Sequence, residues 1–342
     1  MPVVSGSPSL GHPPADGHAQ GQPPRGWDQR PRVCILGRDR RLVVARGTAA
    51  LAARETFQGV RVGFQGKPGA YSEIACEKAF PGCVPAPYRV FSDVFKALSE
   101  GEVDQALLPM ENSTGGSVHD VYLLLPKYGL HVVGEYSLGV EHCLLTHPST
   151  DVSSIKRVFS HWQALAQCAQ YCERMGYQMV EHDDTAGAAA MISANQHNDA
   201  AAIASSRAAE IYELDVKAKG IQDKEDNYTR FVGLSNAPSA PPCQDPSECK
   251  TTIAFACRDG AGGLQELLSR LLALGINLEK IEPQAMLNEP LIDAASGRKF
   301  NYLFVADFKG SIAEPKFDQA FELFEEYTGY YRVFGSYRRH AF

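Results

Sequence analysis

The amino-acid sequence predicts a mixed α/β protein with two folded parts, and three observations support this prediction. The chain has 342 residues, which exceeds one typical domain. Short apolar strands alternate with helical segments along most of it, and this alternation favours an α/β architecture. After a proline-rich stretch at 235–250, the remaining segments follow the order βαββαβ, which is typical of a ferredoxin-like sandwich.

Residues 1–58 differ from the rest of the chain in composition. They are rich in Gly, Pro, Ala, Arg and His, and they hold eight Arg, no Lys and four acidic residues. Because they show little apolar periodicity, they cannot bury enough surface to become ordered, and we expect a flexible head. Its excess of Arg resembles an organelle transit peptide, while an uncleaved disordered tail, or sequence upstream of the true start, fits the same composition.

The composition of the remaining chain argues against several classes of function. Residues 59–342 hold 36 acidic residues against 25 Lys and Arg, and such an acidic body disfavours a nucleic-acid partner. No run of about 18 apolar residues occurs, so we expect no membrane span. The nine cysteines include no Cys-x-x-Cys pair, which argues against a zinc ribbon and predicts mostly reduced thiols in a reducing compartment.

The first folded part is expected to begin with an alternating strand at 60–64. A glycine turn at 66–72 then opens a helix that runs to Phe80, which gives the strand-turn-helix order of a βα unit. Short apolar runs and longer helical segments continue to alternate beyond it. The further expected elements are helix 92–100, strand 105–109, helix 117–125, strand 157–159, helix 163–175, helix 185–194, strand 201–204 and helix 206–212.

The stretch 235–250 carries four prolines and almost no large apolar residue, so we interpret it as a connection between domains. It divides the chain into a domain at 59–236, a linker at 237–249 and a second domain at 250–342. The elements expected in the second domain are strand 250–257, helix 263–274, strand 277–283, strand 302–308, helix 315–327 and strand 331–337.

The polar stretch Glu111–Ser117 directly follows an apolar strand and directly precedes a helix. Its amides and hydroxyls therefore lie between a strand's carboxyl end and a helix amino terminus, where anions bind well. A glycine turn followed by Ser117 as an N-cap explains the same residues without any ligand. This segment alone leaves both interpretations open.

A second polar stretch, 159–168, occupies another strand-to-helix junction. Ser160 is expected to cap the helix, and Gln163 and Gln167 lie four residues apart on one helix face. That face can equally be solvated surface, and His161 can be a structural histidine. A ligand-binding role and a purely structural one remain open here.

The third polar stretch, Asp226–Phe231, leads into a short strand at 231–234. An Arg fixed beside a hydroxyl suits a dianionic substrate, because guanidinium binds carboxylate through two parallel hydrogen bonds. The composition of this stretch is weak evidence by itself. Its value lies in combination with the other two.

Other patterns lack the residues that their chemistry requires. The cluster 181–184 and the pair His142 and His147 lack metal-ligand spacing on a helix, so no metal site is predicted. Gly66 and Gly69 do not complete a dinucleotide fingerprint, and neither a Gly-Lys-Ser/Thr triad nor a Gly-x-Ser-x-Gly elbow occurs. We therefore expect neither a nucleotide cofactor nor a serine hydrolase.

Taken in order, these stretches resemble the prephenate dehydratase family, and its plant-type arogenate dehydratases in particular. The resemblance runs from about Val60 to Leu234 and continues as an ACT domain from Lys250 to Arg339. The motifs that carry it are Gly-x-x-Gly-Ala-Tyr-Ser at 66–72, Asn-Ser-x-x-Gly-Ser at 112–117, Ser-His-x-Gln-x-x-x-Gln-Cys at 160–168, Asp-Thr-Ala-x-Ala-Ala at 184–189, Ala-Ala-Ile-Ala-Ser at 201–205 and Thr-Arg-Phe at 229–231.

The resemblance implies a catalytic domain of two α/β lobes, like a type II periplasmic binding protein, with a small-molecule substrate between the lobes. One lobe would hold residues 61 to about 140 and about 217 to 236, and the other lobe the residues between. The implied reaction is the decarboxylating dehydration of arogenate to phenylalanine, or of prephenate to phenylpyruvate. It needs no metal or cofactor, because aromatisation of the ring drives it.

The resemblance also implies roles for individual residues. Thr229 would donate to the leaving hydroxyl, while Asn112, Ser160 and Gln167 would orient the ring. Arg230 and the helix amino termini behind Ser117 and Thr185 would hold carboxylate. The full implied substrate-binding set is Ala70, Tyr71, Ser113, Gly116, Ser117, His161, Gln163, Thr185, Ala204, Ser205, Arg230 and Phe231.

The ACT domain of the family binds phenylalanine at a subunit interface and inhibits the enzyme. Here the Gly-Ala-Leu motif reads Gly262-Gly263-Leu264, and the Glu-Ser-Arg-Pro motif keeps only Glu282. These departures predict weak or altered inhibition, in a homodimer or homotetramer. The residues implied as phenylalanine contacts are Gly262, Leu264, Asn277, Leu278 and Glu282.

A catalytically silent binding or sensor protein of the same fold is the alternative, because two-lobed folds also capture small ligands without chemistry. The joint presence of Asn112, Gln167 and Thr229 favours an enzyme. Arogenate and prephenate differ only in an amino or a keto group, so one or two contacts decide between them. The expected location is the chloroplast stroma if the head is a transit peptide, and the cytoplasm otherwise.

Overall fold

The structure is a computed structural model that describes residues 57–196, 198–238, 245–258, 262–286, 291–292, 297 and 299–339. These residues belong to one compact unit. The predicted head at 1–58 lies outside them except for its last two positions. Residues 239–244 of the predicted linker also lie outside them.

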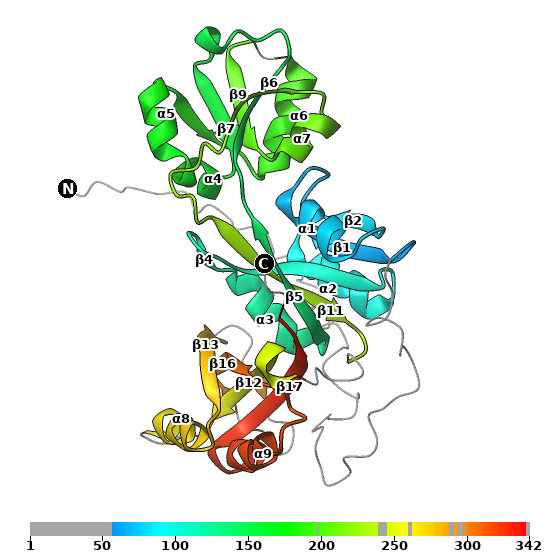
Figure 1. Ribbon diagram of the computed structural model, residues 1–342, viewed down its shortest axis with the longest axis vertical. Coiled ribbons are helices and arrows are strands. Elements are labelled where there is room, and N and C mark those ends of the chain that lie inside the picture. Colours follow the sequence, from blue (N-terminus) through cyan, green and yellow to red (C-terminus); the bar gives the residue numbers. More distant parts are fainter. Residues whose placement is uncertain are drawn as a thin grey trace, which may run out of the picture. The chain divides into compact units, whose positions relative to one another are not determined.

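The first sheet and its helices form a part that we call lobe A (Figure 1). The strand order is β2-β1-β3-β11-β5, and β4 pairs with β3. The β1 strand runs parallel to β2 and β3, whereas β11 runs antiparallel to β3 and β5. Lobe A consists of β1 Arg61–Gln65, α1 Tyr71–Ala79, β2 Val84–Tyr88, α2 Phe91–Glu100, β3 Gln105–Asn112, β4 Gly116–Ser117, α3 His119–Tyr128, β5 His131–Gly139 and β11 Tyr228–Ser235.

The second sheet, with the order β10-β6-β9-β7-β8, forms lobe B. Helices α4 and α5 lie on one side of it and α6 and α7 on the other (Figure 1). Lobe B consists of β6 Cys143–Thr146, η1 Val152–Ser154, β7 Arg157–Ser160, α4 Trp162–Gln167, α5 Ala169–Met175, β8 Gln178–Glu181, α6 Thr185–Asn195, β9 Ala200–Ala204, α7 Ser206–Ile211 and β10 Asp215–Lys219. The chain returns to lobe A after β10, later than the predicted position of about 217, because β10 pairs with β6.

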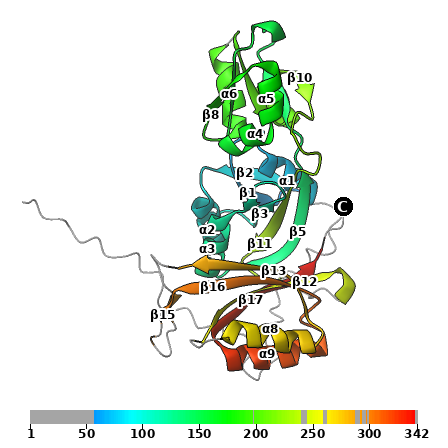
Figure 2. The ribbon, with the colours of Figure 1, turned by 90° about the vertical axis from the view of Figure 1, so that its left-hand side faces the viewer.

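The third sheet has the antiparallel order β13-β16-β12-β17. Figure 2 shows α8 and α9 together on one of its faces. We call this layered part, residues 245–339, the C-terminal sandwich, and its main elements follow the predicted βαββαβ order. They are η2 Pro246–Glu248, β12 Cys249–Cys257, α8 Gly263–Ala273, β13 Asn277–Ala285, β16 Tyr302–Lys309, α9 Pro315–Tyr327 and β17 Thr328–Arg338, with the short pair β14 Leu291–Ile292 and β15 Lys299–Phe300.

One apolar core joins lobe A to the C-terminal sandwich. Leu125 and Val132 of lobe A are buried in the same cluster as Ala254 and Phe334 of the sandwich. The backbones of β5 and β17 approach closely, since a Cβ atom on Gly335 would lie 2.0 Å from the carbonyl oxygen of Val132. Close packing of this kind transmits small displacements, so the two parts are expected to move together.

Two local predictions about helices are wrong. The predicted helix 163–175 is divided at Cys168, because the carbonyl oxygen of Gln167 accepts from the backbone N–H of Asp223 and the N–H of Gln170 donates to the Asp223 carboxylate. Tertiary partners thus replace helical hydrogen bonds at this position. Ser117 does not cap a helix, since it belongs to β4, and α3 starts after it.

The part of the chain that the structure describes lacks two features. None of its helices is both long enough and apolar enough to cross a bilayer. None of its groups of His, Cys, Asp and Glu side chains brings three together as a metal would require. The cysteines found there as free thiols are Cys76, Cys83, Cys143, Cys168, Cys172 and Cys257.

Candidate functional site

The first and third polar stretches meet on neighbouring strands. Asn112 ends β3, Thr229 lies near the start of β11, and the two residues are register partners in the antiparallel ladder. The Asn112 Nδ2 donates to Thr229 Oγ1 at 3.0 Å and to Asn227 Oδ1 at 3.0 Å. Residues that are more than a hundred positions apart in the sequence therefore form one hydrogen-bonded pair.

The loop after Asn112 folds around its side-chain oxygen. Asn112 Oδ1 accepts from the backbone N–H groups of Thr114 at 3.0 Å and Gly115 at 2.8 Å, as in an Asx-turn. Ser113 Oγ donates to the carbonyl of Asp226 at 2.6 Å and accepts from Tyr228 N–H at 3.0 Å. The two stretches are thus held together by side-chain and backbone bonds on both sides of the Asn112–Thr229 pair.

Gln167, at the end of α4 in lobe B, reaches across to this pair. Its Nε2 donates to Asn112 Oδ1 at 3.2 Å and to Thr114 Oγ1 at 2.5 Å. Its Oε1 accepts from Asn227 Nδ2 at 3.0 Å. All three polar stretches therefore converge, as the family resemblance implied, and the amide of Gln167 hydrogen-bonds lobe B to lobe A.

His142 lies directly behind Gln167, in the segment that crosses from lobe A to lobe B. Its Nε2 is 2.7 Å from Gln167 Oε1, and its Nδ1 is 2.9 Å from the hydroxyl of Tyr71. Burial lowers the pKa of His142, so the imidazole is neutral, and its one proton is placed on Nε2 because Gln167 Oε1 can only accept. Burial raises the pKa of Tyr71, which stays protonated.

The lobes touch at a second place, between the loop after β1 and the start of α7. Ser205 Oγ donates to the carbonyl of Gly69 at 2.6 Å and also caps α7. Gly69 has a φ of 88°, and a Cβ atom on it would lie 2.8 Å from the Cα of Ala208. Nearby, a Cβ atom on Gly115 would overlap the amide of Gln163. Glycine is required at Gly69, where the obstacle is the Ala208 backbone, whereas at Gly115 the obstacle is the flexible end of a side chain.

The structure does not bring every predicted residue to this pair. Ser160 is fully buried on β7, where its hydroxyl donates to the carbonyl of Ile203 at 2.6 Å, and His161 caps α4 in its place. Phe231 is buried in the core of lobe A, and Ala204 is buried on β9. These three side chains shape the lobes rather than meeting a substrate.

Arg230 is a clear correction. Its side chain is buried, and its guanidinium is surrounded by the carboxylates of Glu111, Glu135 and Asp307 at 2.7 to 2.9 Å. It therefore cannot hold a substrate carboxylate. Side chains alternate across a strand, so the residue after Thr229 faces the opposite side of the sheet.

Other predicted residues border the site. Thr185 begins α6, whose N-cap is Asp184, and Lys67 of lobe A lies 3.8 Å from that Asp184 carboxylate. His161 is half-buried, and burial lowers its pKa. Ala70 and Tyr71 lead into α1, and Gly116 lies in β4. Lys67 and the N-terminus of α6 therefore meet at the Asp184 carboxylate.

The residues implied as effector contacts lie in the C-terminal sandwich. Gly262 is the N-cap of α8, Leu264 lies in its first turn, and Asn277 and Leu278 begin β13. Glu282 is instead engaged within the chain, because it accepts from Ser117 Oγ at 2.9 Å.

Sequence reasoning missed three members of the site. Asn227 and Thr114 lie inside the polar stretches, but nothing in their residue type separates them from loop residues. His142 was considered only as a metal ligand, together with His147. Its position immediately before the buried strand β6 is the one local signal of a buried histidine.

Comparisons with known proteins identify relatives of this chain. The prephenate dehydratase family matches residues 62–239. Arogenate dehydratase/prephenate dehydratase 2 of Arabidopsis thaliana, named as chloroplastic, is 44% identical over 278 residues, which is 81% of this chain and 72% of the relative. Arogenate dehydratase 1 of Petunia hybrida is 44% identical over 285 residues, which is 81% of this chain and 66% of the relative.

Two solved structures share the fold. A prephenate dehydratase of Arthrobacter aurescens in complex with L-Phe superposes with a TM-score of 0.72 at 27% identity, covering 82% of this chain and 90% of that one. GqqA, whose structure is presented as a novel type of quorum-quenching acylase, has a TM-score of 0.73 at 32% identity and covers 82% of this chain and 98% of its own. The match in sequence and fold leads to one conclusion: the chain belongs to the prephenate dehydratase family.

Proposed function

We propose that this protein is an arogenate dehydratase, a lyase that removes water and carbon dioxide from arogenate and leaves phenylalanine. Prephenate, which would give phenylpyruvate, is the second substrate. The observation that carries the proposal is the convergence of Asn112, Gln167 and Thr229 from three separate stretches. The names of the plant relatives support the choice of arogenate.

The hydroxyl of Thr229 is suited to assist departure of the leaving hydroxyl. Because Thr229 Oγ1 accepts a hydrogen bond from Asn112 Nδ2, its own hydrogen remains available for donation. An aliphatic hydroxyl is too weak an acid to transfer its proton completely, so it acts as a hydrogen-bond donor that strengthens as charge develops on the departing oxygen, and the leaving hydroxide takes the proton that makes it water from solvent. Formation of the aromatic ring supplies the driving force.

The amides of Asn112 and Gln167 hydrogen-bond to each other across the lobes. A substrate that enters between the lobes must replace this bond, so the lobes must separate and then close. Closure excludes water, which strengthens the remaining polar contacts and protects the reacting ring. Gln167 thus both closes the site and orients the ring.

The substrate carboxylates need a cationic or amide-rich partner, and Arg230 is not available for this role. Lys67 and the first turn of α6 offer one when a substrate carboxylate displaces Asp184, which here pairs with Lys67 and accepts from the N–H of Gly187. Lys67 belongs to lobe A and α6 to lobe B, so a carboxylate held there is bound by both lobes.

The C-terminal sandwich is proposed to be an ACT domain that binds phenylalanine, in a homodimer or homotetramer. Its βαββαβ order and the L-Phe complex of the Arthrobacter aurescens relative support this assignment. Because Glu282 is already engaged by Ser117, weak or altered inhibition is expected. Activity that persists in millimolar phenylalanine agrees with this expectation, and strong inhibition contradicts it.

We place the protein in the chloroplast, because several of its relatives are named as chloroplastic proteins. A fusion of residues 1–58 to a fluorescent protein tests whether the head directs import. Fluorescence in plastids supports the assignment, and fluorescence confined to the cytosol opposes it.

Substrate choice is tested with purified protein that lacks residues 1–58. Arogenate and prephenate are supplied separately, and phenylalanine and phenylpyruvate are measured separately. Faster formation of phenylalanine from arogenate supports the proposal. Turnover of prephenate alone contradicts the choice of arogenate, and turnover of neither substrate favours the silent binding protein.

A further inference from the structure

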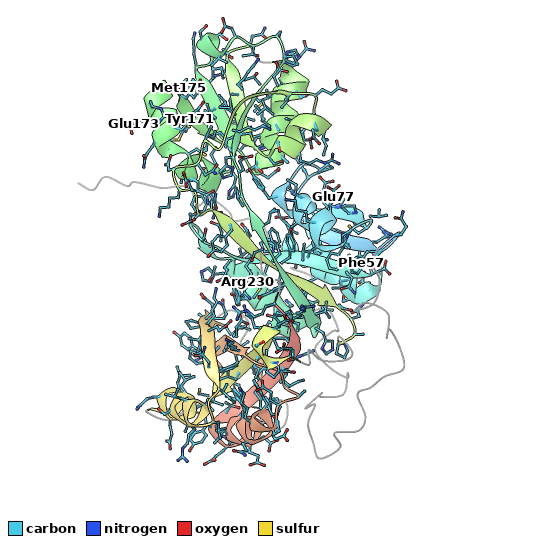
Figure 3. The ribbon with its side chains drawn as sticks, in the orientation of Figure 1. Phe57, Glu77, Tyr171, Glu173, Met175 and Arg230 are labelled. Carbon is cyan, nitrogen blue, oxygen red and sulfur yellow. The ribbon has the colours of Figure 1, made fainter. Side chains whose placement is uncertain are left out.

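Arg230, labelled in Figure 3, is the centre of a buried charge cluster that links lobe A to the C-terminal sandwich. Its Nη1 donates to Glu135 Oε2 of β5 at 2.9 Å. Its Nη2 is 2.9 Å from Asp307 Oδ2 of β16, and its Nε is 2.7 Å from Glu111 Oε1 of β3, in ion pairs that are not linear hydrogen bonds. The guanidinium is therefore held by carboxylates from three different strands.

Each of these carboxylates has further partners in the sandwich. Lys250 Nζ of β12 donates to Glu135 Oε2 at 2.8 Å, and Lys280 of β13 pairs with Glu111. Asp307 Oδ1 accepts from Thr252 Oγ1 at 2.7 Å. The side chains of Arg230, Glu135, Lys250 and Asp307 are at most 8% exposed. At this burial the charges are poorly screened by solvent, and each depends on its partners.

Two members of the charge cluster, Arg230 and Glu111, lie on the same two strands as the proposed catalytic pair. Thr229 pairs with Asn112 in the ladder, and the adjacent residues Arg230 and Glu111 pair next to them. Neighbouring side chains on a strand point to opposite faces. The site and the cluster are thus the two faces of a single segment of the β3–β11 ladder.

A register irregularity follows immediately, between Arg230 and Phe231. Beyond it the ladder no longer continues the regular pairing that precedes it, and bulges of this kind re-aim side chains next to active sites. On its other side β11 pairs with β5 in regular register from Tyr228 to Gly233, so the irregularity concerns the β3 side of this segment.

A second connection runs from the same strands to the sandwich. Ser117 of β4 pairs with Glu111 in the sheet, and its hydroxyl donates to Glu282 of β13. Lys280 Nζ donates to the same hydroxyl at 3.2 Å. The strand that ends in Asn112 is thus held by the sandwich on this side too.

We propose that Arg230 is a positioning residue for Thr229 and Asn112, and that Asp307 of the C-terminal sandwich holds Arg230 in place, so that the sandwich completes the catalytic site. This inference rests on the roles given to Thr229 and Asn112 above. Without Asp307, the guanidinium is left with Glu111 and Glu135, both in lobe A, and is drawn toward them. The end of β11 then shifts, and with it the Thr229 hydroxyl.

A small shift is sufficient to affect the reaction. Misplacement of a reacting group by about 1 Å costs on the order of a hundredfold in rate. Binding of the substrate depends on many contacts, whereas assistance to the leaving hydroxyl depends on one oxygen. A positional defect therefore lowers kcat much more than it changes KM.

A purely structural role makes a different prediction. The shared apolar core already joins lobe A to the sandwich, so charges that only add stability would leave the site in place when one is removed. Such a variant would melt at a lower temperature but would retain its kcat at temperatures where it is folded.

The test compares full-length Asp307→Asn with the wild type, well below either melting temperature. The matched control is Glu248→Gln, another carboxylate of the sandwich, which pairs with the exposed Arg338. We expect Asp307→Asn to lower kcat about tenfold or more with KM changed less than about threefold, and the control to leave both unchanged. Asp307→Glu, which keeps the charge, should recover part of the lost kcat.

Arg230→Lys gives a second test, which also covers failure of Asp307→Asn to fold. It keeps the charge but offers one compact ammonium in place of the planar guanidinium, so a similar loss of kcat is expected. The double variant Arg230→Lys/Asp307→Asn should lose little more kcat than the more strongly affected single variant, because both changes break the same contact. Independent losses that multiply would contradict the inference.

The outcomes separate this inference from the proposed function. A wild type without turnover on arogenate or prephenate removes the proposed function, and this inference with it. An active wild type together with a folded Asp307→Asn of unchanged kcat overturns only the positioning role. The positioning role is also overturned if Asp307→Glu rescues stability but not turnover.

Discussion

The amide of Gln167 offers a quantitative test of how the site is assembled. Replacing it with leucine keeps a similar volume but removes all four of its hydrogen bonds: those to Asn112, Thr114, Asn227 and His142. Asn112 Oδ1 still accepts from the loop that follows it. The loss therefore falls mainly on the donors of Asn227 and His142.

The expected magnitude follows from burial. His142 is 2% exposed, so its Nε2–H cannot find water easily, and a buried donor without a partner costs about 1–3 kcal/mol. Asn227 is 3% exposed and loses a neutral hydrogen bond worth about 1 kcal/mol. Gln167→Leu should therefore lower the free energy of unfolding by about 2–4 kcal/mol.

Turnover should fall as well, because the substrate loses the amide that orients its ring. A loss of about 3 kcal/mol in the transition state corresponds to roughly a hundredfold in kcat/KM. Urea denaturation and steady-state kinetics measure the two effects. Gln170→Leu is the control, since Gln170 lies three residues further on with its side chain exposed. A Gln167→Leu protein with wild-type stability and turnover would refute this account of the site.

Two further predictions concern the contact between the lobes and the buried histidines. Gly69→Ala should lower the free energy of unfolding by about 2 kcal/mol or more and should also lower kcat/KM, because Gly69 has a φ of 88° and an added Cβ would clash with Ala208. The control is Gly101→Ala, since Gly101 has a similar φ but open space around it. This control should lower stability and leave turnover intact. Burial lowers the pKa of three histidines, which are His131, His142 and His161. Their pKa values in the folded protein lie below the unfolded value of about 6.5. The stability that these histidines contribute is therefore complete above that pH and is lost as the pH falls through their folded pKa values. Each histidine changes the free energy of unfolding by at most about 1.4 kcal/mol per pH unit. Urea denaturation at pH 7.5 and 5.5 should show a smaller pH effect in His142→Phe than in the wild type, and an identical pH effect in both would contradict the assignment of a neutral His142.

Much of the fold follows from local sequence patterns. The strand at 60–64, the βαββαβ order of the sandwich and most helices match the structure within a few residues, because their apolar periodicity agrees with their final burial. The strands β2, β5, β6, β8 and β10 were not predicted, and of these β8 and β10 are edge strands with weak patterns. The break at Cys168 was not predictable from local signals, since it depends on Asp223, which lies 55 residues later.

The candidate site was likewise predicted only in part. The family resemblance implied that Asn112, Gln167 and Thr229 share one site, and the structure brings them together. Local patterns alone left a structural role open for each of the three stretches. The role given to Arg230 was wrong, although strand alternation alone indicates that neighbours of Thr229 face away from it. Its true partner, Asp307, belongs to the other predicted domain, and no local pattern connects the two.

The most direct test of the central claim is the effect of Thr229→Ala on binding and on turnover, measured separately in the same protein. Substrate affinity is obtained by calorimetry at low temperature, and kcat from single-turnover formation of product. We expect affinity to change by less than about tenfold and kcat to fall by about a hundredfold or more, while Thr229→Ser, which keeps the hydroxyl, stays close to the wild type. A Thr229→Ala protein that binds substrate and retains its full kcat would show that the reaction does not depend on this hydroxyl.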